Sequence, residues 1–341
     1  MIESGLGARG SGLGEPLLSV QGLTTVFDVG ATPLIAVNDV SFDIRRGETL
    51  GLVGESGSGK SVTAYSLMRL VQPPGRIASG RVFFRGTDLL SLPEREMCRV
   101  RGAGIGLVFQ EPMAALNPVM RVGKQIGEAL VVHGMASSRQ ARDKAIELLR
   151  AVKIVDPERR VDDYPHQLSG GMRQRVMLAV ALACKPPLVI ADEPTTALDV
   201  TVQAQILDLL REMKRAFDLS LLLITHDLGV IAEVADRVAV MYAGRIVEEG
   251  PVRTIFREPA HPYTRGLLAS MPRGLAGGRL AAIDGTVPNL GSLPPGCAFA
   301  PRCSSRLDEC DRAVPPDVQV AEGHRARCVL HASATAAGRA R

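Results

Sequence analysis

Gly54-Glu55-Ser56-Gly57-Ser58-Gly59-Lys60-Ser61 fits the pattern G-x-x-x-x-G-K-[ST]. The apolar run 48–53 before it predicts a buried strand, and the apolar spacing over 60–71 predicts a helix. A strand, a glycine-rich loop and a helix in this order form a phosphate-binding loop, whose backbone N–H groups face phosphate oxygens. There Lys60 would reach the β- and γ-phosphates, and Ser61 would hold Mg²⁺. We therefore predict that the chain binds a nucleoside triphosphate with Mg²⁺.

Length and composition bound the class of protein. The chain has 341 residues, 46% of them hydrophobic, which suits two or three domains with sizeable cores. The net charge of +4 is too small to favour nucleic acid or anionic lipid. No run approaches the about 18 apolar residues of a membrane span, and residues 1–16 lack the apolar core of a secretory signal. We expect a flexible N-terminus, a cytoplasmic protein and no nucleic-acid partner.

Apolar runs alternate with amphipathic helical patterns along residues 17–258. This alternation predicts an α/β fold with a largely parallel sheet. After about residue 258 prolines become frequent and the alternation stops, so residues 259–331 are predicted to form a small C-terminal module, followed by a flexible tail at 332–341. The predicted strands are 17–27, 36–44, 81–85, 105–110, 188–191, 219–225, 237–242 and 245–249, and the predicted helices are 88–101, 138–154, 171–184 and 201–217.

A second candidate for nucleotide chemistry is an apolar run that ends in two acids. Residues 188–191 are apolar, and Asp192 and Glu193 follow them. An aspartate at a strand end can hold Mg²⁺, and the next carboxylate can polarise an attacking water as a general base. Alone, the pattern would also fit a solvated acidic turn. The phosphate-binding loop upstream favours the catalytic interpretation.

A glycine-rich stretch between these two motifs resembles a motif of a known protein family. The run Leu168-Ser169-Gly170-Gly171, followed by Gln174, resembles the signature motif of the ATP-binding subunits of ABC transporters, with Met172-Arg173 widening the usual spacing. At a helix start, the serine and glycines would form a second anion cradle. The resemblance implies a head-to-tail dimer. In it, the loop at Lys60 of one subunit and Ser169 of the other would enclose one ATP.

The resemblance covers residues 17–258 and implies a P-loop NTPase fold. We expect a parallel-sheet core, an antiparallel β subdomain and a helical subdomain at about 111–180. The small module at 259–331 would follow this ATP-binding domain.

Five further positions correspond to functional residues of the family. Gln110 resembles a glutamine that touches Mg²⁺ or water, and Asp199, in Ala197-Leu198-Asp199, resembles an aspartate that crosses the dimer interface. His226 resembles the histidine that contacts the γ-phosphate, although a lone histidine after a strand is more often structural. Phe27 stands where the family stacks an aromatic ring on adenine, but it also fits a core position. Val62 directly follows the phosphate-binding loop and completes the expected ATP-binding residues.

The segment 257–264, Arg-Glu-Pro-Ala-His-Pro-Tyr-Thr, resembles the oligopeptide/dipeptide (and nickel) permease branch of the family. Residues 109–113 and 116–118 resemble the same branch. The branch implies two integral membrane permease subunits, a second homologous ATP-binding subunit and an extracytoplasmic solute-binding protein. The chain would then lie peripherally on the cytoplasmic face of the cell membrane.

Four cysteines cluster near the C-terminus with the spacing C-x5-C-x6-C-x17-C. In a cytosolic protein such a cluster suggests a metal more than disulfides. Four thiolates suit either an iron–sulfur cluster or Zn²⁺. The family branch implies a [4Fe–4S] cluster, with Zn²⁺ or no metal as alternatives. The four residues are Cys297, Cys303, Cys310 and Cys328.

Together these motifs predict the ATPase subunit of an ABC importer that takes up dipeptides or oligopeptides. The first alternative is a soluble ABC-type ATPase acting on nucleic acid or ribosomes. Such proteins usually carry two cassettes or a long coiled coil, whereas one phosphate-binding loop and one signature occur here. An importer of nickel or another solute, or an exporter ATPase, remains a further alternative.

Overall fold

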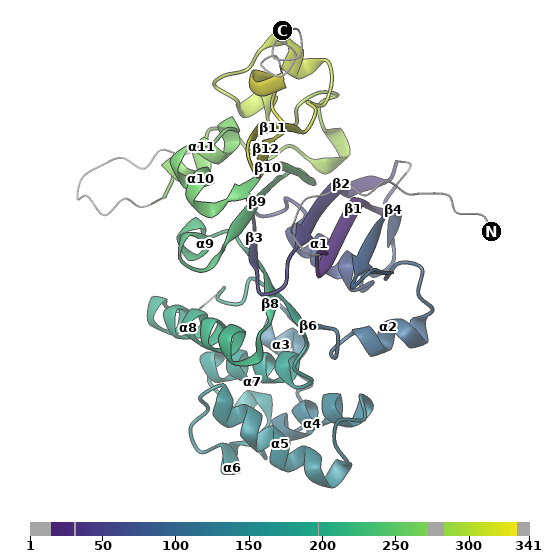
Figure 1. Cartoon of the computed structure of the whole chain (residues 1–341), viewed down its shortest axis with the longest axis vertical. Coiled ribbons are helices and arrows are strands. Elements are labelled where there is room, and N and C mark those ends of the chain that lie inside the picture. Colours follow the sequence, from purple (N-terminus) through teal and green to yellow (C-terminus); the bar gives the residue numbers. More distant parts are fainter. Residues whose placement is uncertain (1–14, 31, 197, 272–282, 333–341) are drawn as a thin grey trace, which may run out of the picture.

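A mixed sheet forms the centre of the molecule (Figure 1). The computed structural model describes residues 15–30, 32–196, 198–271 and 283–332, so the expected flexible N-terminus, Ala197 and the tail lie wholly or largely outside it. The strand order is β11-β12-β10-β9-β3-β8-β7-β6, parallel from β9 to β6. The strands are β3 Thr49–Val53, β6 Ile105–Val108, β7 Leu188–Asp192, β8 Ser220–Thr225, β9 Arg237–Tyr242, β10 Arg245–Pro251, β11 Val318–Ala321 and β12 His324–Ala326.

The parallel register brings the chemical motifs to one edge of this sheet. Strands β3, β7 and β8 are buried along their whole length, which explains their continuous apolar runs. Val53 pairs with Thr225, and Asp192 pairs with Ile224. The carboxyl ends of the three strands therefore meet, and the segments that follow them start side by side.

A smaller antiparallel sheet packs beside the first, with the order β2-β1-β4-β5. Helix α1, Lys60–Leu67, contacts both β1 and β7 and so lies between the two sheets. Buried residues of both sheets and of this helix, such as Leu23, Leu52 and Leu67, share one hydrophobic core. The strands are β1 Leu18–Phe27, β2 Leu34–Ile44, β4 Gly75–Phe84 and β5 Thr87–Asp88.

A group of helices forms one end of the molecule (Figure 1). Helix α5 begins with a capping box of Ser137 and Gln140 and buries one face. Its contacts are with α4, α6 and α7, and α7 in turn contacts β6 and α8. The helices between β6 and β8 in the sequence are α3 Pro112–Ala115, α4 Val122–Val132, α5 Ser138–Ala151, α6 Pro157–Arg160, η1 Pro165–Gln167, α7 Gly170–Leu182 and α8 Val200–Phe217, of which α4, α5 and α6 lie at that end (Figure 1).

The C-terminal segment continues the central sheet. Strand β12 pairs with β10 through Glu248 and Ala326, and β11 pairs with β12. This pairing joins residues after 318 to the ATP-binding domain, while the domain boundary near residue 258 stays a prediction. The helical pieces are α9 Leu228–Val234, α10 Val252–Arg257, α11 Pro262–Ala269, η2 Leu290–Ser292, η3 Ala300–Arg302 and η4 Asp308–Asp311.

Two predicted elements differ from the structure by more than four residues at one end. The helix predicted at 88–101 is confined to α2, Glu94–Val100, because the Asp88 carboxylate accepts hydrogen bonds from the N–H groups of Val82 and Leu90 and forms a turn instead. The strand predicted at 81–85 is the end of β4, whose exposed first half has no apolar alternation.

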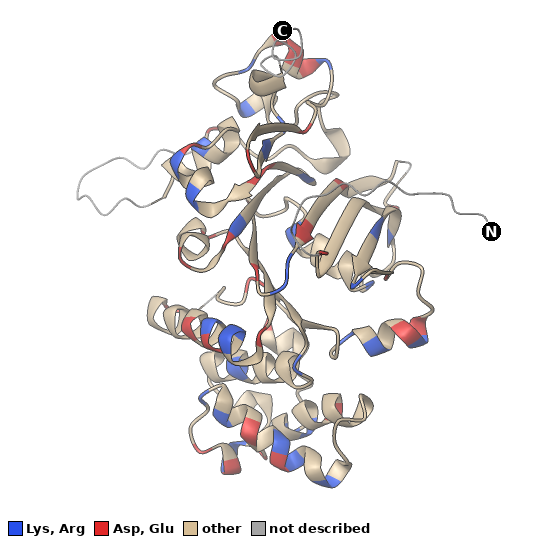
Figure 2. Ribbon diagram, in the orientation of Figure 1, with Lys and Arg blue, Asp and Glu red and all other residues tan. Residues whose placement is uncertain are grey.

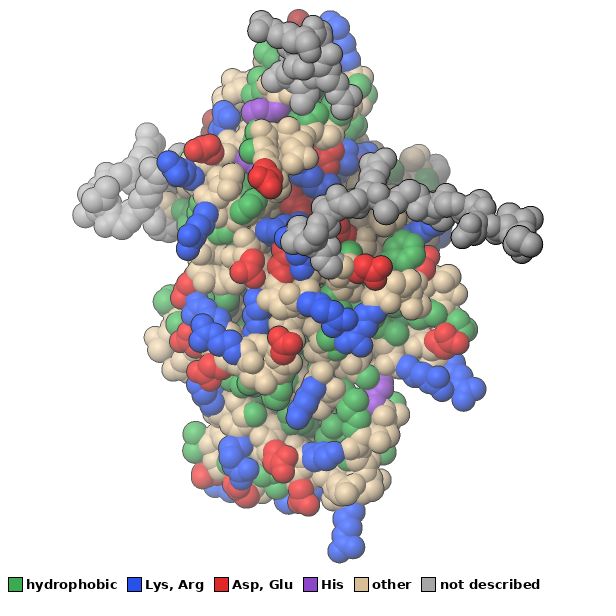
Figure 3. All heavy atoms as spheres, in the orientation of Figure 1, with side chains coloured by type: hydrophobic (Ala, Val, Ile, Leu, Met, Phe, Trp, Pro, Cys, Tyr) green, Lys and Arg blue, Asp and Glu red, His purple; other side chains and the backbone are tan. Residues whose placement is uncertain are grey.

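The surface mixes charges of both signs. Figure 2 shows acidic and basic residues interspersed along α2, α5 and α8, and the face in Figure 3 carries no large patch of one sign. Among the helices of the described residues, none is long and apolar enough to cross a membrane.

Candidate active site

The phosphate-binding loop follows β3 and packs closely against β2 and β9. A Cβ atom on Gly59 would lie 2.4 Å from the carbonyl oxygen of Ala36, and one on Gly54 would lie 2.1 Å from that of Met241. Gly59 also has a φ of 101°, a conformation that favours glycine. Gly54 and Gly59 are therefore required by close backbone approach.

Lys60 lies across the mouth of this loop. Its Nζ donates to the carbonyl oxygens of Gly54 at 2.7 Å and Glu55 at 2.9 Å. Burial lowers the pKa of Lys60, while the negative charges of Glu193 and Asp192 oppose this shift. A buried ammonium bonded only to neutral oxygens can exchange these partners for phosphate oxygens.

Ser61 and Asp192 form the candidate magnesium site. The Ser61 hydroxyl donates to Oδ1 of Asp192 at 3.0 Å. Burial raises the pKa of Asp192 to about 6, and its other oxygen, Oδ2, has no hydrogen-bond partner among the described residues. An orphaned buried carboxylate oxygen beside a serine hydroxyl fits the oxygen ligands that Mg²⁺ prefers.

Glu193 is the meeting point of three other side chains. Its Oε2 accepts from Thr196 Oγ1 at 2.6 Å and from Gln110 Nε2 at 3.3 Å, and His226 Nδ1 lies 3.3 Å away. The backbone of Glu193 has a φ of 45°, rare for a residue with a side chain, and its N–H donates to Ile224 at 2.9 Å. The structure thus brings together three catalytic residues that the sequence predicts, and adds Thr196, which the sequence analysis missed.

The signature residues lie away from this group. Ser169 caps α7 by accepting from the N–H of Met172, and both Ser169 and Gly170 are exposed. Leu168 and Gln174 are buried, and the Nε2 of Gln174 has no partner within the described residues. Asp199, also exposed, caps α8 through the N–H of Val202 at 2.9 Å. The described contacts include none that joins the signature to the phosphate-binding loop of the same chain.

Two expected ATP-binding residues lie at the edge of the site. Phe27 ends β1, where its ring approaches Gly75 so closely that a Cβ there would lie 2.7 Å from Phe27 Cε1. Val62 is half-buried on α1 and packs against the core between the two sheets. Their contact with a base or ribose stays a prediction.

Two residues of the C-terminal segment hold the phosphate-binding loop, and the sequence analysis missed both roles. Arg302 donates to both oxygens of Glu55, at 2.7 and 3.0 Å, and the N–H of Glu55 donates to the hydroxyl of Tyr263 at 2.9 Å. The Arg302 side chain is only 5% exposed. We call these contacts the Glu55 clamp. The one sequence feature that could have indicated a cationic partner is the acidic residue Glu55 within the loop.

The metal expectation for the four cysteines is wrong. Among the described residues, no group of three or more His, Cys, Asp or Glu side chains could hold a metal ion. Cys297, Cys303, Cys310 and Cys328 line a cavity of about 10 Å³. Burial raises the pKa of Cys297 to about 11 and raises that of Cys303 and Cys328, which favours neutral thiols over the thiolates that bind metals. Neither the [4Fe–4S] cluster nor Zn²⁺ is supported.

Similarity to known proteins identifies the family. Residues 37–196 match the family described as ABC transporter, and residues 247–310 match the oligopeptide/dipeptide transporter, C-terminal region. The chain is 52% identical over 318 residues to the dipeptide transport ATP-binding protein DppD of Bacillus subtilis, covering 93% of this chain and 95% of the relative. This chain belongs to the ATP-binding proteins of ABC transporters. The resemblance seen in its motifs is thereby confirmed.

Other relatives of this ABC ATP-binding protein agree. It is 51% identical to the oligopeptide transport ATP-binding protein OppD of Salmonella typhimurium, over 88% of this chain and 89% of the relative. It is 54% identical to a putative peptide import ATP-binding protein of Brucella abortus, over 92% of this chain and 97% of the relative.

Solved structures of the ABC cassette share the fold. The cassette MJ0796, a dimer in a post-hydrolysis state bound to ADP and Pi, aligns with a TM-score of 0.63 and 28% identity, over 69% of this chain and 99% of that one. The protein cbiO1 of Clostridium perfringens, part of an ABC transporter complex, aligns with a TM-score of 0.61 and 26% identity, over 72% of this chain and 92% of that one. The chain therefore has the fold of an ATP-hydrolysing ABC cassette.

Proposed function

We propose that this chain hydrolyses ATP to power an ABC importer of dipeptides or oligopeptides. The observation that carries the ATPase activity is the convergence of Gln110, Thr196 and His226 on Glu193, beside the Ser61–Asp192 pair. The named peptide-transport relatives and the match at 247–310 support the peptide class. They favour it over a soluble ATPase acting on nucleic acid or ribosomes.

Each side chain of the site would have a separate role toward a bound nucleotide. Bound Mg-ATP supplies the γ-phosphoryl group and the metal charge that offsets its negative oxygens. Lys60 would turn its ammonium from the loop carbonyls to phosphate oxygens, and Ser61 with Asp192 would hold the metal. Glu193 would take a proton from the attacking water, oriented by Gln110. His226, 61% exposed at its side chain, would contact the γ-phosphate.

The signature would act on a second subunit. Ser169 and Gly170 are exposed at the start of α7, where backbone N–H groups can bind an anion. They make no described contact with their own phosphate-binding loop, so a head-to-tail dimer would let them close over the ATP of a partner. Asp199 would lie at that interface. The dimeric state of the relative MJ0796 supports this arrangement.

The remaining partners follow from the importer. Two integral membrane permease subunits, a second homologous ATP-binding subunit and an extracytoplasmic solute-binding protein would complete it. The chain would lie peripherally on the cytoplasmic face of the membrane, and the permeases and binding protein would select the solute. We assign residues 17–258 to the ATP-binding domain, with a helical subdomain at about 111–180, and 259–331 to the C-terminal module.

Glu193→Gln tests the proposal directly. The amide keeps the size of the side chain but accepts no proton, so we expect ATP binding to persist and turnover to fall at least about a hundredfold. Turnover and nucleotide affinity are measured on the purified chain, and peptide uptake on the importer reconstituted with its permeases. Glu212→Gln, on a surface ion pair with Lys153, is the control. Near-normal turnover in Glu193→Gln would refute the base assignment.

A further inference from the structure

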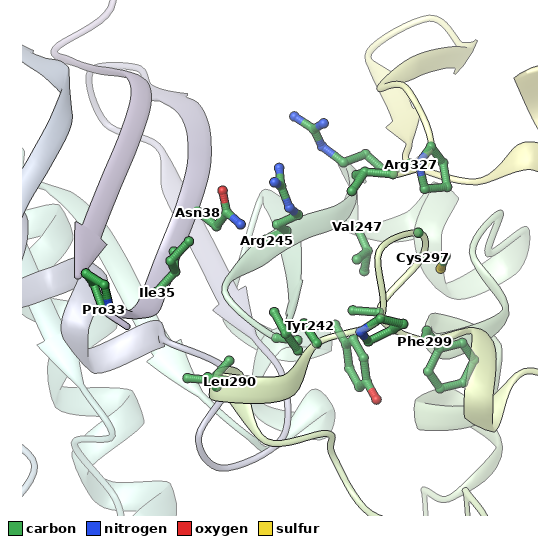
Figure 4. A pocket seen from close by; sticks show the side chains of 18 of the residues that line it. Pro33, Ile35, Asn38, Tyr242, Arg245, Val247, Leu290, Cys297, Phe299 and Arg327 are labelled. Atoms are coloured by element: carbon green, nitrogen blue, oxygen red, sulfur yellow. The ribbon is translucent and has the colours of Figure 1, made fainter. Parts of the chain in front are cut away.

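A cavity of about 290 Å³ lies between the ATP-binding domain and the C-terminal segment (Figure 4). We call it the junction pocket. Its walls come from the start of β2, the turn between β9 and β10, and residues 290–299 and 314–315. The residues that line it include neither Phe27 nor any member of the phosphate-binding loop. It is therefore distinct from the ATP site.

One side of the junction pocket is apolar and rigid. Figure 4 shows Leu290, Tyr242 and Phe299 together on this side. The rings of Tyr242 and Phe299 meet edge to face, with centroids 5.3 Å apart, and both residues are buried. Aromatic walls held in this way offer a preformed surface for an apolar group.

The other side is cationic. Arg245, Arg327 and Asn38 lie there, and the two guanidinium groups share a single carboxylate, that of Asp39. Arg327 donates to Asp39 Oδ2 at 3.2 Å, and Arg245 approaches the same oxygen to 3.6 Å. Two positive charges against one negative charge leave an excess of one.

Of the two arginines, Arg245 has fewer hydrogen-bond partners. Its side chain is 22% exposed, and its guanidinium makes no hydrogen bond to any residue that the structure describes. Burial and the neighbouring charge of Arg327 lower the pKa of Arg245. A planar guanidinium presents its donors as a fork that matches a carboxylate. An incoming carboxylate would bring both a hydrogen-bond partner and the missing negative charge.

We propose that the junction pocket binds a small carboxylate with an apolar body, which Arg245 and Arg327 hold by its charged end. The apolar body lies against Leu290, Tyr242 and Phe299. Short apolar peptides and fatty carboxylates share this chemistry. The site does not depend on the proposed transport function, because it is tested by binding to the chain alone.

The test is calorimetric titration of the purified full chain with three probes. Leu-Leu and octanoate each carry a carboxylate and an apolar body, and Leu-Leu amide lacks the carboxylate. We expect at least one carboxylate to bind, and Arg245→Gln and Arg327→Gln each to weaken it about tenfold or more, because a charge-assisted bond is lost. The control is Arg257→Gln, whose side chain is 85% exposed and lies outside the pocket.

Each outcome of the titration either supports or overturns the proposed carboxylate site. Binding of octanoate alone supports the site and identifies a fatty carboxylate as its ligand, whereas binding of Leu-Leu identifies a peptide. No binding of either would overturn the proposal. Equal binding of Leu-Leu and its amide, or undiminished binding in both arginine variants, would also overturn it. The amide comparison uses the unaltered chain, so it does not depend on how well a variant folds.

Discussion

At the scale of single residues, Glu55 connects two distant parts of the chain. It stands inside the phosphate-binding loop, yet its carboxylate and its N–H are held by Arg302 and Tyr263. The hydrogen bonds from Arg302 to Glu55 raise the pKa of this already basic guanidinium, although burial opposes the shift. The C-terminal segment therefore holds the loop at Glu55, whose carbonyl oxygen also accepts from Lys60 Nζ at 2.9 Å.

Arg302→Lys should loosen the Glu55 clamp. Lysine keeps the charge but loses the two-pronged contact, so we expect ATP affinity to fall about three- to tenfold. Binding is measured with a fluorescent nucleotide. Arg306→Lys serves as control, because Arg306 forms an exposed ion pair with Asp311 in the same segment. Equal affinity in both variants would show that the clamp does not position the loop.

At the scale of elements, the start of α8 combines two properties in one side chain. Asp199 caps this helix, satisfying an N–H that would otherwise lack a partner, and it also lies exposed where we place the dimer interface. The family resemblance implies the role at the dimer interface, and the structure shows the helix cap. A substitution that keeps the cap separates them.

Asp199→Ala should lower the free energy of unfolding by about 1 kcal/mol, whereas Asp199→Ser should lower it much less, because serine also caps. If Asp199 acts at the interface, both variants lose ATP turnover. Chemical denaturation and turnover assays are read together. Full turnover in the stable Asp199→Ser variant would limit the residue to capping.

A second element-scale feature is the start of α11, which is held by a buried polar network. His261 Nδ1 accepts from the N–H of Tyr263, and Glu248 accepts from the N–H groups of Ala260 and His261 and contacts His324 at 2.8 Å. Burial lowers the pKa of His261 to about 4; nearby Glu248 opposes this shift, and Arg265 and His331 add to it. This histidine is therefore neutral in the folded chain at neutral pH.

Acid should weaken the fold through His261. Between pH about 6.5 and 4 the unfolded chain binds this proton more tightly than the folded chain does. Stability is therefore full above that window and falls as pH decreases through it, by up to about 3 kcal/mol. His261→Asn, which keeps an acceptor for the cap, should flatten this part of the pH profile of unfolding. An unchanged profile would contradict the assignment.

At the scale of the whole molecule, the site is divided between two surfaces. The phosphate-binding loop and Glu193 lie at the carboxyl edge of the central sheet, whereas Ser169 lies at the start of α7 among the helices. In the proposed head-to-tail dimer, a complete ATP site would require two chains. Mixing two inactive variants distinguishes a shared site from a site within one chain.

Lys60→Ala and Ser169→Arg should each abolish turnover alone. In a head-to-tail dimer of one chain of each kind, both lesions fall in the same site, and the other site is intact. We expect the mixture to regain ATP-dependent dimers and measurable turnover. Size-exclusion chromatography detects the dimers, and phosphate release measures the turnover. No recovery on mixing, with both variants folded, would argue against a site shared between two copies of this chain.

The sequence by itself determined the ABC cassette and indicated the candidate residues of its site. The site motifs are three short stretches of consecutive residues, 54–61, 168–174 and 192–193. The chemistry of each stretch depends on the strand or helix directly beside it, so the local sequence pattern was sufficient to recognise it. The sequence placed Gln110, Glu193 and His226 each after a predicted strand, but their convergence depends on the neighbouring order β8-β7-β6, which only the tertiary structure shows.

Only the tertiary structure decided how the C-terminal segment joins the cassette. Arg302 lies 247 residues from Glu55 in sequence, and no local pattern encodes a contact at that separation. Cysteine spacing suggested a metal, but the folded chain buries these thiols without forming a metal-binding group among its described residues. The junction pocket likewise exists only because distant segments meet. Packing of remote segments is set by shape and charge together, which one-dimensional periodicity does not record.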